Sequence, residues 1–363
     1  MSNRKVVMVT GIANSWGHAF AQKMISEENN LDQQKYSVIG LDSIPPEEEI
    51  RGFDFIQADL RNSHLVELIR TEKVDIVCHL TFPDSIQSTS SSFDINILGT
   101  MKLFGACAEA GVQKIILKSS MAVYGARPDN PSFISEQNSL NGSRTNQYTR
   151  YLVEVETFCN SFKKQVPEMT ITVLRFANII GTKADTPISR LLKEELVPKL
   201  MGFDPRMQVI HENDVLDALL YVTKNDMPGI FNIAAEGVLP ISKIIALTGK
   251  IPLPIFHPFA YWGKRFFGNA NNQLLKYWPI EPDYLRYSWV GDLAKMRQEL
   301  GFVPKFTAEE ALREFTREQQ LRRFTPETLD LEYDETSLKN TIEKRSKGKE
   351  VDLSRVDLQA EEN

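Results

Sequence analysis

The sequence lacks the features that mark several classes of protein. Its three cysteines, Cys78, Cys107 and Cys159, are too widely spaced for a metal site, so we expect reduced thiols in the core of a cytoplasmic protein. No apolar run is long enough to span a membrane, and the strand expected from Lys5 leaves no room for a secretory signal. There is no basic excess, because the net charge is −6, and this charge gives no sign of a nucleic-acid partner.

The N-terminal residues contain the strongest pattern. Residues 6–9 form a continuous apolar run, typical of a strand buried on both faces of a parallel sheet, and the spacing becomes helical after Gly17. Gly11 allows a tight turn and Gly17 a close approach of helix and strand, so that a pyrophosphate can reach the N–H groups of the helix N-terminus. The middle glycine of this pattern is absent, since Asn14 stands there. The stretch predicts half of a dinucleotide-binding site.

Two carboxylates extend this prediction. Asp42 ends the strand expected at residues 36–42, where an acid accepts hydrogen bonds from the adenosine ribose hydroxyls. A carboxylate there repels a ribose phosphate, and no arginine follows immediately, so we expect NAD rather than NADP. Asp59 ends a further short strand at residues 53–60. The alternative is that Asp42 and Asp59 only cap turns.

Strands and helices then alternate along the chain. Further strands are expected at residues 74–80, 114–118 and 170–175, and helices at 62–70, 93–110 and 147–165. This alternation predicts an α/β fold, a Rossmann-type doubly wound parallel sheet. Beyond residue 187 we expect a helix at 188–200 and a strand at 207–211.

The predicted organisation has two lobes and a tail. The NAD-binding Rossmann domain covers residues 1–186, and residues 207–235 return to it. A smaller C-terminal substrate lobe covers residues 187–206 and 236–328. Residues 329–363 are charged and poor in aromatics, so we expect a flexible charged tail.

The order of short motifs is the most specific signal. The motifs are Thr10-Gly11 with Gly17, Asp42, Asp59-Leu60, His79-Leu80, Asn96, and residues 119–125, 174–181 and 209–215. In this order they resemble the extended short-chain dehydrogenase/reductase family, in particular its NAD-dependent epimerases and dehydratases. The resemblance covers about residues 5–315.

The resemblance implies an NAD held between the two lobes, a small-molecule substrate and no metal. It implies that Ser120 orients the substrate and that Tyr148 is the acid/base. The residues expected to bind the cofactor are Gly11, Asn14, Ser15, Trp16, Gly17, Asp42, Asp59, Leu60, Leu80, Thr81, Asn96, Tyr148 and Phe176.

The family's active-site lysine is missing. It stands four residues after the tyrosine, binds the nicotinamide ribose and lowers the tyrosine pKa; here Leu152 takes its place. A free tyrosine has a pKa near ~10, and each unit of lowering takes about 1.4 kcal/mol, so the change removes a main source of activation. The nearest cations are Arg150, Arg144 and Lys118. Of these, Lys118 shares a strand face with Ser120, although each could equally be a solvated charge.

A second departure concerns the substrate. Nucleotide-sugar members carry an arginine that grips the diphosphate at the position of Met207, and Arg206 would face the other way in a strand. A nucleoside-diphosphate sugar is therefore less expected than the resemblance alone implies. His211 and Asp214 are expected to bond backbone groups and cap the following helix.

Residues 251–289 are rich in proline and aromatics. We favour the interpretation that they fill the core of the substrate lobe. The alternatives are an apolar substrate pocket and a surface at 256–289 that contacts a membrane or a partner protein. A second copy of the chain, in a homodimer, is a further candidate partner.

Two hypotheses about function follow. Ser120, Tyr148 and Asn96 favour an NAD-dependent epimerase, dehydratase or oxidoreductase that transfers hydride on a sugar-like or other small hydroxylated substrate. Leu152 favours a catalytically degenerate protein that keeps NAD as a structural or sensing ligand and binds a partner. We carry the enzyme forward as the first hypothesis.

Overall fold

The computed structural model describes residues 4–29, 35–46, 52–81, 90–143, 146–181, 184, 186–256, 281–324 and 339. The chain divides into two compact units, Met1–Thr316 and Arg317–Asn363. The sheet and the candidate site both belong to the first unit. The predicted tail at residues 329–363 lies outside the described residues, apart from Lys339.

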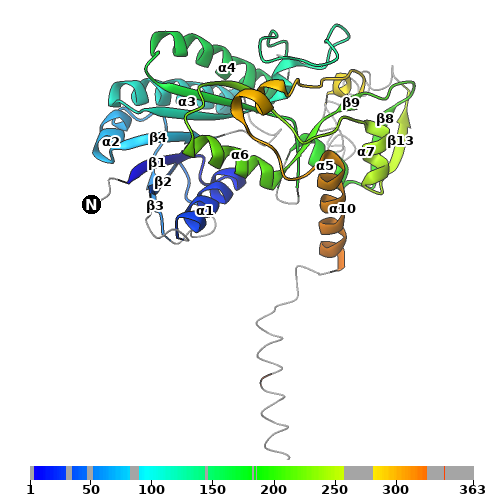
Figure 1. Cartoon of the computed structure of the whole chain (residues 1–363), viewed down its shortest axis with the longest axis horizontal. Helices are drawn as coiled ribbons and strands as arrows, with labels where there is room; N and C mark the ends of the chain where they lie inside the picture. The colour runs from blue at the N-terminus through cyan, green and yellow to red at the C-terminus, as the bar shows by residue number, and fades with distance from the viewer. Residues whose placement is uncertain are drawn as a thin grey trace, which may run out of the picture. The chain divides into compact units, whose positions relative to one another are not determined.

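A seven-stranded sheet lies at the centre of the first unit (Figure 1). All its neighbouring strands are parallel. In spatial order they are β11 (Gly229–Ile233), β6 (Thr170–Phe176), β5 (Lys114–Ser120), β4 (Val74–His79), β1 (Lys5–Thr10), β2 (Tyr36–Asp42) and β3 (Asp54–Gln57). From β1 the chain first adds β2 and β3 on one side and then adds β4, β5, β6 and β11 on the other side. Such a switch point between β1 and β4 forms a crevice at the carboxyl ends of these two strands. The predicted doubly wound parallel sheet is confirmed.

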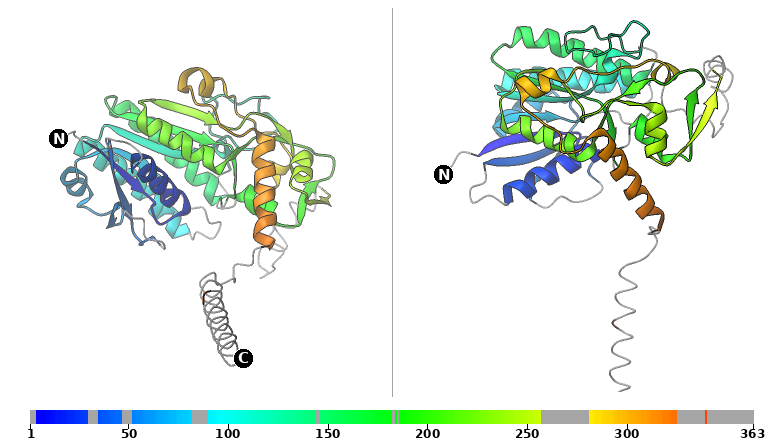
Figure 2. Two further views of the ribbon diagram at one scale, coloured as in Figure 1. Left: turned by 60° about the horizontal axis from the view of Figure 1, so that its bottom comes forward. Right: turned by 45° about the vertical axis from the view of Figure 1, so that its right-hand side comes forward.

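Helices cover both faces of this sheet (Figures 1 and 2). One face carries α1 (Ser15–Asn29) and α6 (Glu212–Lys224). The other carries α2 (Leu65–Thr71), α3 (Ser90–Ala110) and α4 (Gln147–Gln165). Helix α4 begins after Asn146, whose side chain accepts a hydrogen bond from the Thr149 N–H at 3.2 Å. This cap fixes where the helix starts, and so where Tyr148 lies.

A buried ion pair joins β6 to α4. Arg175 and Glu156 are each 1% exposed, and the Arg175 Nη2 and Nε atoms lie 2.6 and 2.8 Å from Glu156 Oε2. Ser119 at the end of β5 also donates to Glu156. On the other side, Arg175 donates to the Tyr124 hydroxyl at 2.6 Å, and Tyr124 donates to Asn232 of β11 at 2.7 Å. Burial raises the pKa of Tyr124 to about 12, so its hydroxyl stays protonated.

The remaining elements form a second apolar core. Its strands are paired as β7 (Asn178–Ile180) with β10 (Val209–His211), β9 (Arg206–Met207) with β12 (Leu239–Pro240), and β8 (Leu196–Leu200) with β13 (Ile251–Ile255). Its helices are α5 (Pro187–Lys193), α7 (Ile241–Leu247) and α10 (Ala308–Phe324), with the short turn η2 (Pro282–Leu285). The turn η3 (Met296–Leu300) packs into the main core instead, beside β11. Ile188, Leu192, Ile244 and Leu312 lie in this core. The exact division into lobes stays a prediction.

The helix predicted at residues 188–200 is wrong in its second half. Helix α5 ends at Lys193, and residues 196–200 form β8 instead. Pro198 has no N–H and its ring clashes with a preceding helical turn, so a helix cannot pass through it. Strand β8 pairs with β13, where the Ile251 N–H donates to the Glu195 carbonyl at 3.0 Å. Pro252 and Pro254 alternate with the residues that donate toward β8.

The described end of the aromatic stretch is mostly core. Tyr284 and Trp289 are buried and pack edge to face at 5.0 Å between ring centroids. They belong to the main apolar cluster rather than to the second core, and both also line the pocket described below. Phe256 is exposed, and residues 257–280 lie outside the described residues, so the proposed membrane or protein contact there stays a prediction.

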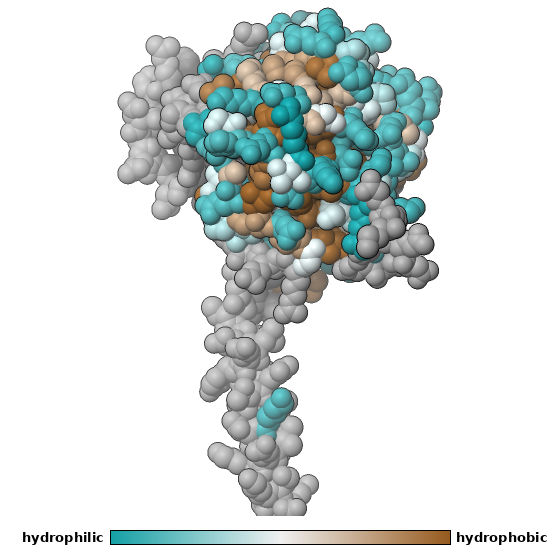
Figure 3. All heavy atoms as spheres, turned by 90° about the vertical axis from the view of Figure 1, so that its left-hand side faces the viewer, coloured by the Kyte–Doolittle hydropathy of each residue, from teal (hydrophilic) through white to brown (hydrophobic). Residues whose placement is uncertain are grey.

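On the face shown in Figure 3, apolar residues lie between hydrophilic ones. Within the described residues no helix is both long and apolar enough to cross a bilayer. The three cysteines are free and buried, and burial raises the pKa of each thiol to about 12, so they are inert core thiols. The described part of the chain holds no cluster of metal-binding side chains.

We predict that Arg175→Met lowers the free energy of unfolding by about 3–5 kcal/mol, because it leaves the Glu156 carboxylate buried and unpaired. The matched control is Arg150→Met. Arg150 pairs with Glu154 at 2.7 Å on the exposed face of the same helix, so this change should cost less than about 1 kcal/mol. Urea denaturation of both variants measures the difference. Equal losses would contradict the assignment of the buried pair as the main link between α4 and the sheet.

Candidate functional site

Glycine is required at two positions of the turn between β1 and α1. Gly11 has φ of +78°, and a Cβ there would lie 2.7 Å from the Thr81 nitrogen. A Cβ at Gly17 would lie only 2.1 Å from the Gly11 carbonyl oxygen. Both distances are well below van der Waals contact, so a side chain at either position would displace the helix from the strands.

Asn14 takes the place of the missing middle glycine and caps α1. Its side-chain oxygen accepts from the Gly17 N–H at 2.8 Å, and its amide donates to the Leu80 carbonyl at 2.8 Å. It therefore links the helix N-terminus to the end of β4. Because Asn14 already accepts the hydrogen bond from the Gly17 N–H, a phosphate at this helix end would accept hydrogen bonds from the N–H groups of Ser15 and Trp16.

Asp42 lies beside this turn. Its carboxylate accepts from the Ala13 N–H at 3.0 Å and from the Ser43 N–H at 2.7 Å. It is therefore more than a turn cap at its own strand end, because it reaches the glycine turn of β1. Its role toward the ribose stays a prediction.

Asp59 is engaged with its own neighbour. Arg61 donates to it from Nε at 2.9 Å and from Nη2 at 2.6 Å, and these bonds hold the pKa of Asp59 below its usual range. Leu60 lies against α3, where a Cβ at Gly99 would be 3.3 Å from the Leu60 Cβ. The structure thus places Asp59 and Leu60 just after β3, with Leu60 against α3, and a contact of either residue with the cofactor stays a prediction.

The floor of the crevice is a buried hydrogen-bonded group. His79 lies between the Thr10 hydroxyl, 2.7 Å from Nδ1, and the Thr100 hydroxyl, 2.9 Å from Nε2. Burial lowers the pKa of His79 to about 4, so the ring is neutral. Thr100 donates to the Asn96 carbonyl at 2.9 Å, so its oxygen accepts from His79 Nε2. Thr81 donates to Thr10 at 3.4 Å, which joins the expected cofactor residues Thr81 and Asn96 to the same group.

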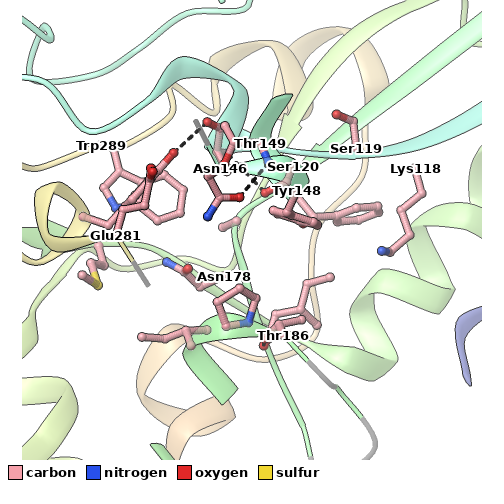
Figure 4. A pocket seen from close by; sticks show the side chains of 18 residues that line it. Lys118, Ser119, Ser120, Asn146, Tyr148, Thr149, Asn178, Thr186, Glu281 and Trp289 are labelled. Carbon is pink, nitrogen blue, oxygen red and sulfur yellow. Dashed lines mark hydrogen bonds between the residues drawn. The ribbon is translucent and has the colours of Figure 1, made fainter. Parts of the chain in front are cut away.

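Ser120, Tyr148 and Phe176 line a single pocket (Figure 4). The space that they surround is about 810 Å³, which includes space open to solvent. The other lining residues are Lys118, Ser119, Ala122, Asn146, Thr149, Ala177, Asn178, Ile179, Thr186, Pro187, Ile188, Met207, Glu281, Tyr284 and Trp289. The two predicted catalytic residues are therefore neighbours of one cavity.

Local structure orients both catalytic candidates. Ser120 is the last residue of β5 and caps the short turn η1 (Met121–Tyr124), since its hydroxyl oxygen accepts from the Ala122 N–H at 3.2 Å. Accepting this bond leaves the hydroxyl proton for a substrate oxygen. Tyr148 is half-buried in the first turn of α4.

Position 152 lies in the core. Leu152 is 1% exposed and belongs to the main apolar cluster. Of the three cations considered as replacements, Arg150 is bound to Glu154 on the exposed side, and Arg144 lies outside the described residues. Lys118 is buried and lines the pocket, with Nζ 4.9 Å from the centroid of the Trp16 ring.

The substrate side of the pocket carries a carboxylate. Met207 is buried and lines the pocket, whereas Arg206 is exposed, as the strand alternation predicts. Glu281 lines the pocket and accepts from the Ser143 hydroxyl at 2.8 Å. Trp289 is 6% exposed, and its indole N–H has no acceptor among the described residues.

Sequence reasoning missed Glu281 and Trp289 as pocket residues, because they lie more than a hundred residues from Tyr148 and no local motif marks them. Asn178 belonged to a quoted motif, yet its place in the pocket was not inferred. The Asn178 amide donates to the Gln208 carbonyl at 3.0 Å, and the residue lines the cavity.

His211 and Asp214 bind backbone groups, as predicted. The His211 Nδ1 accepts from the Asn213 N–H at 3.2 Å and caps α6. Asp214 does not cap this helix; its two oxygens accept from the Lys305 and Phe306 N–H groups at 2.8 and 3.2 Å. Burial raises the pKa of Asp214 despite these bonds.

A doubly wound parallel sheet, a glycine turn at its switch point and a serine–tyrosine pocket beside that turn define a Rossmann protein of the short-chain dehydrogenase/reductase type. The sequence model of the NAD-dependent epimerase/dehydratase family matches residues 7–234. The chain belongs to this family, and NAD is its cofactor.

Known proteins similar to the chain include an uncharacterized protein of Mycobacterium tuberculosis, which is 33% identical over 318 residues, or 85% of this chain and 82% of that protein. The bovine dTDP-D-glucose 4,6-dehydratase is 29% identical over 239 residues, or 59% of this chain and 63% of that enzyme.

Solved structures share the fold. The dTDP-glucose 4,6-dehydratase DesIV of Streptomyces venezuelae, solved with NAD, aligns with a TM-score of 0.67 and 17% identity over 90% of this chain and all of that one. MoeE5, solved with UDP-glucuronic acid and NAD, aligns with a TM-score of 0.64 and 22% identity over 86% of this chain and 99% of that one.

The residues around the turn fit NAD. The Trp16 indole N–H is buried at the start of α1 with no acceptor among the described residues, so a donor is left for a ligand there. The glycines keep the turn tight, and the Asp42 carboxylate lies beside the turn, where an acid that binds the ribose is expected.

We predict that Asp42→Ala weakens NAD binding by about ten- to a hundredfold, the range expected for lost hydrogen bonds to a charged group. NADP binding should weaken less, because the variant also loses the repulsion of the ribose phosphate. Asp54→Ala is the control, since Asp54 is exposed at the start of β3 and should leave the NAD affinity unchanged. Calorimetric titration measures all four affinities, and tighter binding of NADP than NAD to the unmodified protein would contradict the role of Asp42.

Proposed function

We propose that the protein is an NAD-dependent enzyme that transfers hydride to or from a carbinol carbon of a small hydroxylated substrate. The observation that carries the proposal is the placement of Ser120 and Tyr148 on one pocket, beside the glycine turn that the family uses for NAD. The pocket combines apolar walls with a few polar groups, as small-molecule sites do.

In the proposed mechanism Tyr148 exchanges the proton of the reacting hydroxyl. The Ser120 hydroxyl donates a hydrogen bond to the substrate oxygen and holds that oxygen toward Tyr148. NAD, when bound, supplies the hydride acceptor or donor. Phe176 is fully buried beside the pair, and we propose that it excludes water from the reacting carbon.

We propose that the substrate lacks a nucleoside diphosphate. No arginine is among the described residues that line the pocket, and the Glu281 carboxylate on its far side from Lys118 would repel a diphosphate (Figure 4). The Trp289 N–H and the Asn178 amide suit the hydroxyl oxygens of a neutral, sugar-like molecule. DesIV is named a dTDP-glucose 4,6-dehydratase, and MoeE5 was solved with UDP-glucuronic acid. We propose that the substrate of this chain resembles only the sugar portion of such molecules.

The second candidate is a catalytically degenerate NAD-binding protein, and the burial of Leu152 favours it. With Leu152 in the core, the helix position that activates the tyrosine in this family holds no charge. Under this candidate NAD binds, but no substrate is turned over.

The enzyme proposal predicts that reduced NAD accumulates with neutral polyols or cyclic sugars and not with UDP-glucose or dTDP-glucose. Tyr148→Phe should lower kcat by about 10²–10⁴, because it removes the proton-exchanging group. Ser120→Ala should also lower kcat. The matched control is Tyr221→Phe on α6, outside the pocket, which should leave kcat unchanged.

Single-turnover absorbance measurements follow the reduced cofactor, so that a net-neutral epimerisation is also detected. Faster turnover of a nucleotide sugar than of any neutral polyol would contradict the proposed substrate class. Full activity of Tyr148→Phe would contradict the mechanism.

We predict that Leu152→Lys destabilises the protein by several kcal/mol, because a lysine there is buried in the apolar cluster. The only acid one turn further along α4, Glu156, is already paired with Arg175. Leu152→Met is the control for volume and should cost less than about 1.5 kcal/mol. Thermal melting with and without NAD measures both, and a stable Leu152→Lys variant with tighter NAD binding would contradict this expectation.

A further inference from the structure

We propose that Lys118 supplies to NAD the cation that this chain lacks at position 152. In this arrangement the charge comes from strand β5 rather than from helix α4, and Lys118 binds the nicotinamide-ribose half of the cofactor. The inference deepens the proposed function, but it depends only on NAD binding and not on turnover.

The first argument is the position of Lys118 on its strand. Lys118 and Ser120 are two residues apart on β5, so their side chains leave the same face of the sheet. Both line the pocket, together with Tyr148. Figure 4 shows the Lys118 side chain bending toward this pocket, at the end opposite Glu281.

The second argument is the contact with Trp16. The Lys118 Nζ lies 4.9 Å from the centroid of the Trp16 ring, close enough for a cation–π interaction. Trp16 is the second residue of α1, at the helix N-terminus where a pyrophosphate binds. The ammonium therefore lies between the phosphate end of the cofactor site and the Ser120–Tyr148 pair. In NAD the nicotinamide ribose links the pyrophosphate to the nicotinamide ring, so the ammonium lies where this ribose is expected.

The third argument compares Lys118 with another buried lysine of β5. Lys114 is 3% exposed, and its Nζ donates to the carbonyls of Val222, Thr223 and Asn225 at 3.1–3.2 Å and pairs with Asp226 at 2.5 Å. These contacts anchor the strand to the end of α6. Lys118 is also buried, at 4% exposed, but its side chain lines the pocket beside the Trp16 ring, so its charge lies at the cavity where a ligand would bind.

The chemistry matches what the missing lysine would do. An ammonium offers three donors, enough to bind ribose hydroxyls and still face the aromatic ring. The buried Trp16 indole N–H, which has no acceptor within the described ranges, adds a neutral donor next to it. Lys118 is therefore a charged donor at one end of the pocket, with the Trp16 ring against it, and Glu281 is the acid at the other end.

The test compares binding of NAD with binding of AMP, which contains only the adenosine half. Lys118→Met should weaken NAD binding about tenfold or more and leave AMP binding within about twofold. Met keeps the length of the side chain and makes favourable contacts with an aromatic ring, so the variant should fold. Lys118→Gln is a second neutral variant in which the same selective loss is expected.

Lys114→Met is the matched control, because it removes a buried lysine from the same strand outside the pocket. It should lower the melting temperature without changing the ratio of the NAD and AMP affinities. Asp42→Ala, in contrast, should weaken both ligands.

A selective loss of NAD affinity in either Lys118 variant supports the proposal, whether or not a substrate is ever turned over. Unchanged NAD affinity would overturn it. An equal loss of NAD and AMP affinity would also overturn it, because the lysine would then act on the whole site or on folding rather than on the nicotinamide half.

Discussion

The buried ion pair between Arg175 and Glu156 fixes the rotation of α4, and the candidate site depends on that rotation. Tyr148, Leu152 and Glu156 recur every four residues, so they lie along one stripe of the helix. Arg175 on β6 binds Glu156 at the far end of this stripe and turns it toward the sheet. With the stripe held there, Tyr148 reaches the pocket and Leu152 enters the core. This contact in the interior thus helps to set the position of the helix end that carries Tyr148.

Three departures from the family pattern alter chemistry while the backbone keeps its path. Asn14 replaces a glycine, but its side chain caps α1 and holds the end of β4. Leu152 replaces a lysine and fills apolar space. Met207 replaces an arginine and packs into the second core. In each case the side chain satisfies a local packing or hydrogen-bonding need. At positions 152 and 207 the neutral side chain also leaves no charge for a ligand.

The strand, turn and helix that carry Gly11 and Gly17 were predictable because their signals are local. The strand, the turn and the helix around Gly11 and Gly17 follow one another in sequence, and Asp42 ends the next strand. The substrate half was not predictable in the same way. Pro198 ends the predicted helix at 188–200 early, but only the pairing of β8 with β13 shows what replaces it. Glu281 and Trp289 lie nearly half of the chain away from β5 in sequence and reach the pocket through tertiary contacts, which no short motif records.

The prolines of β13 also determine what this strand can join. The N–H groups of Ile251, Leu253 and Ile255 point toward β8, since the Ile251 N–H donates to Glu195. The alternate positions, Pro252 and Pro254, face the other edge and have no N–H to offer. The outer edge of β13 therefore lacks the N–H donors that a further strand would need for pairing. Although Ile251 and Leu253 are exposed apolar residues, the strand is protected against sheet extension and the aggregation that begins with it.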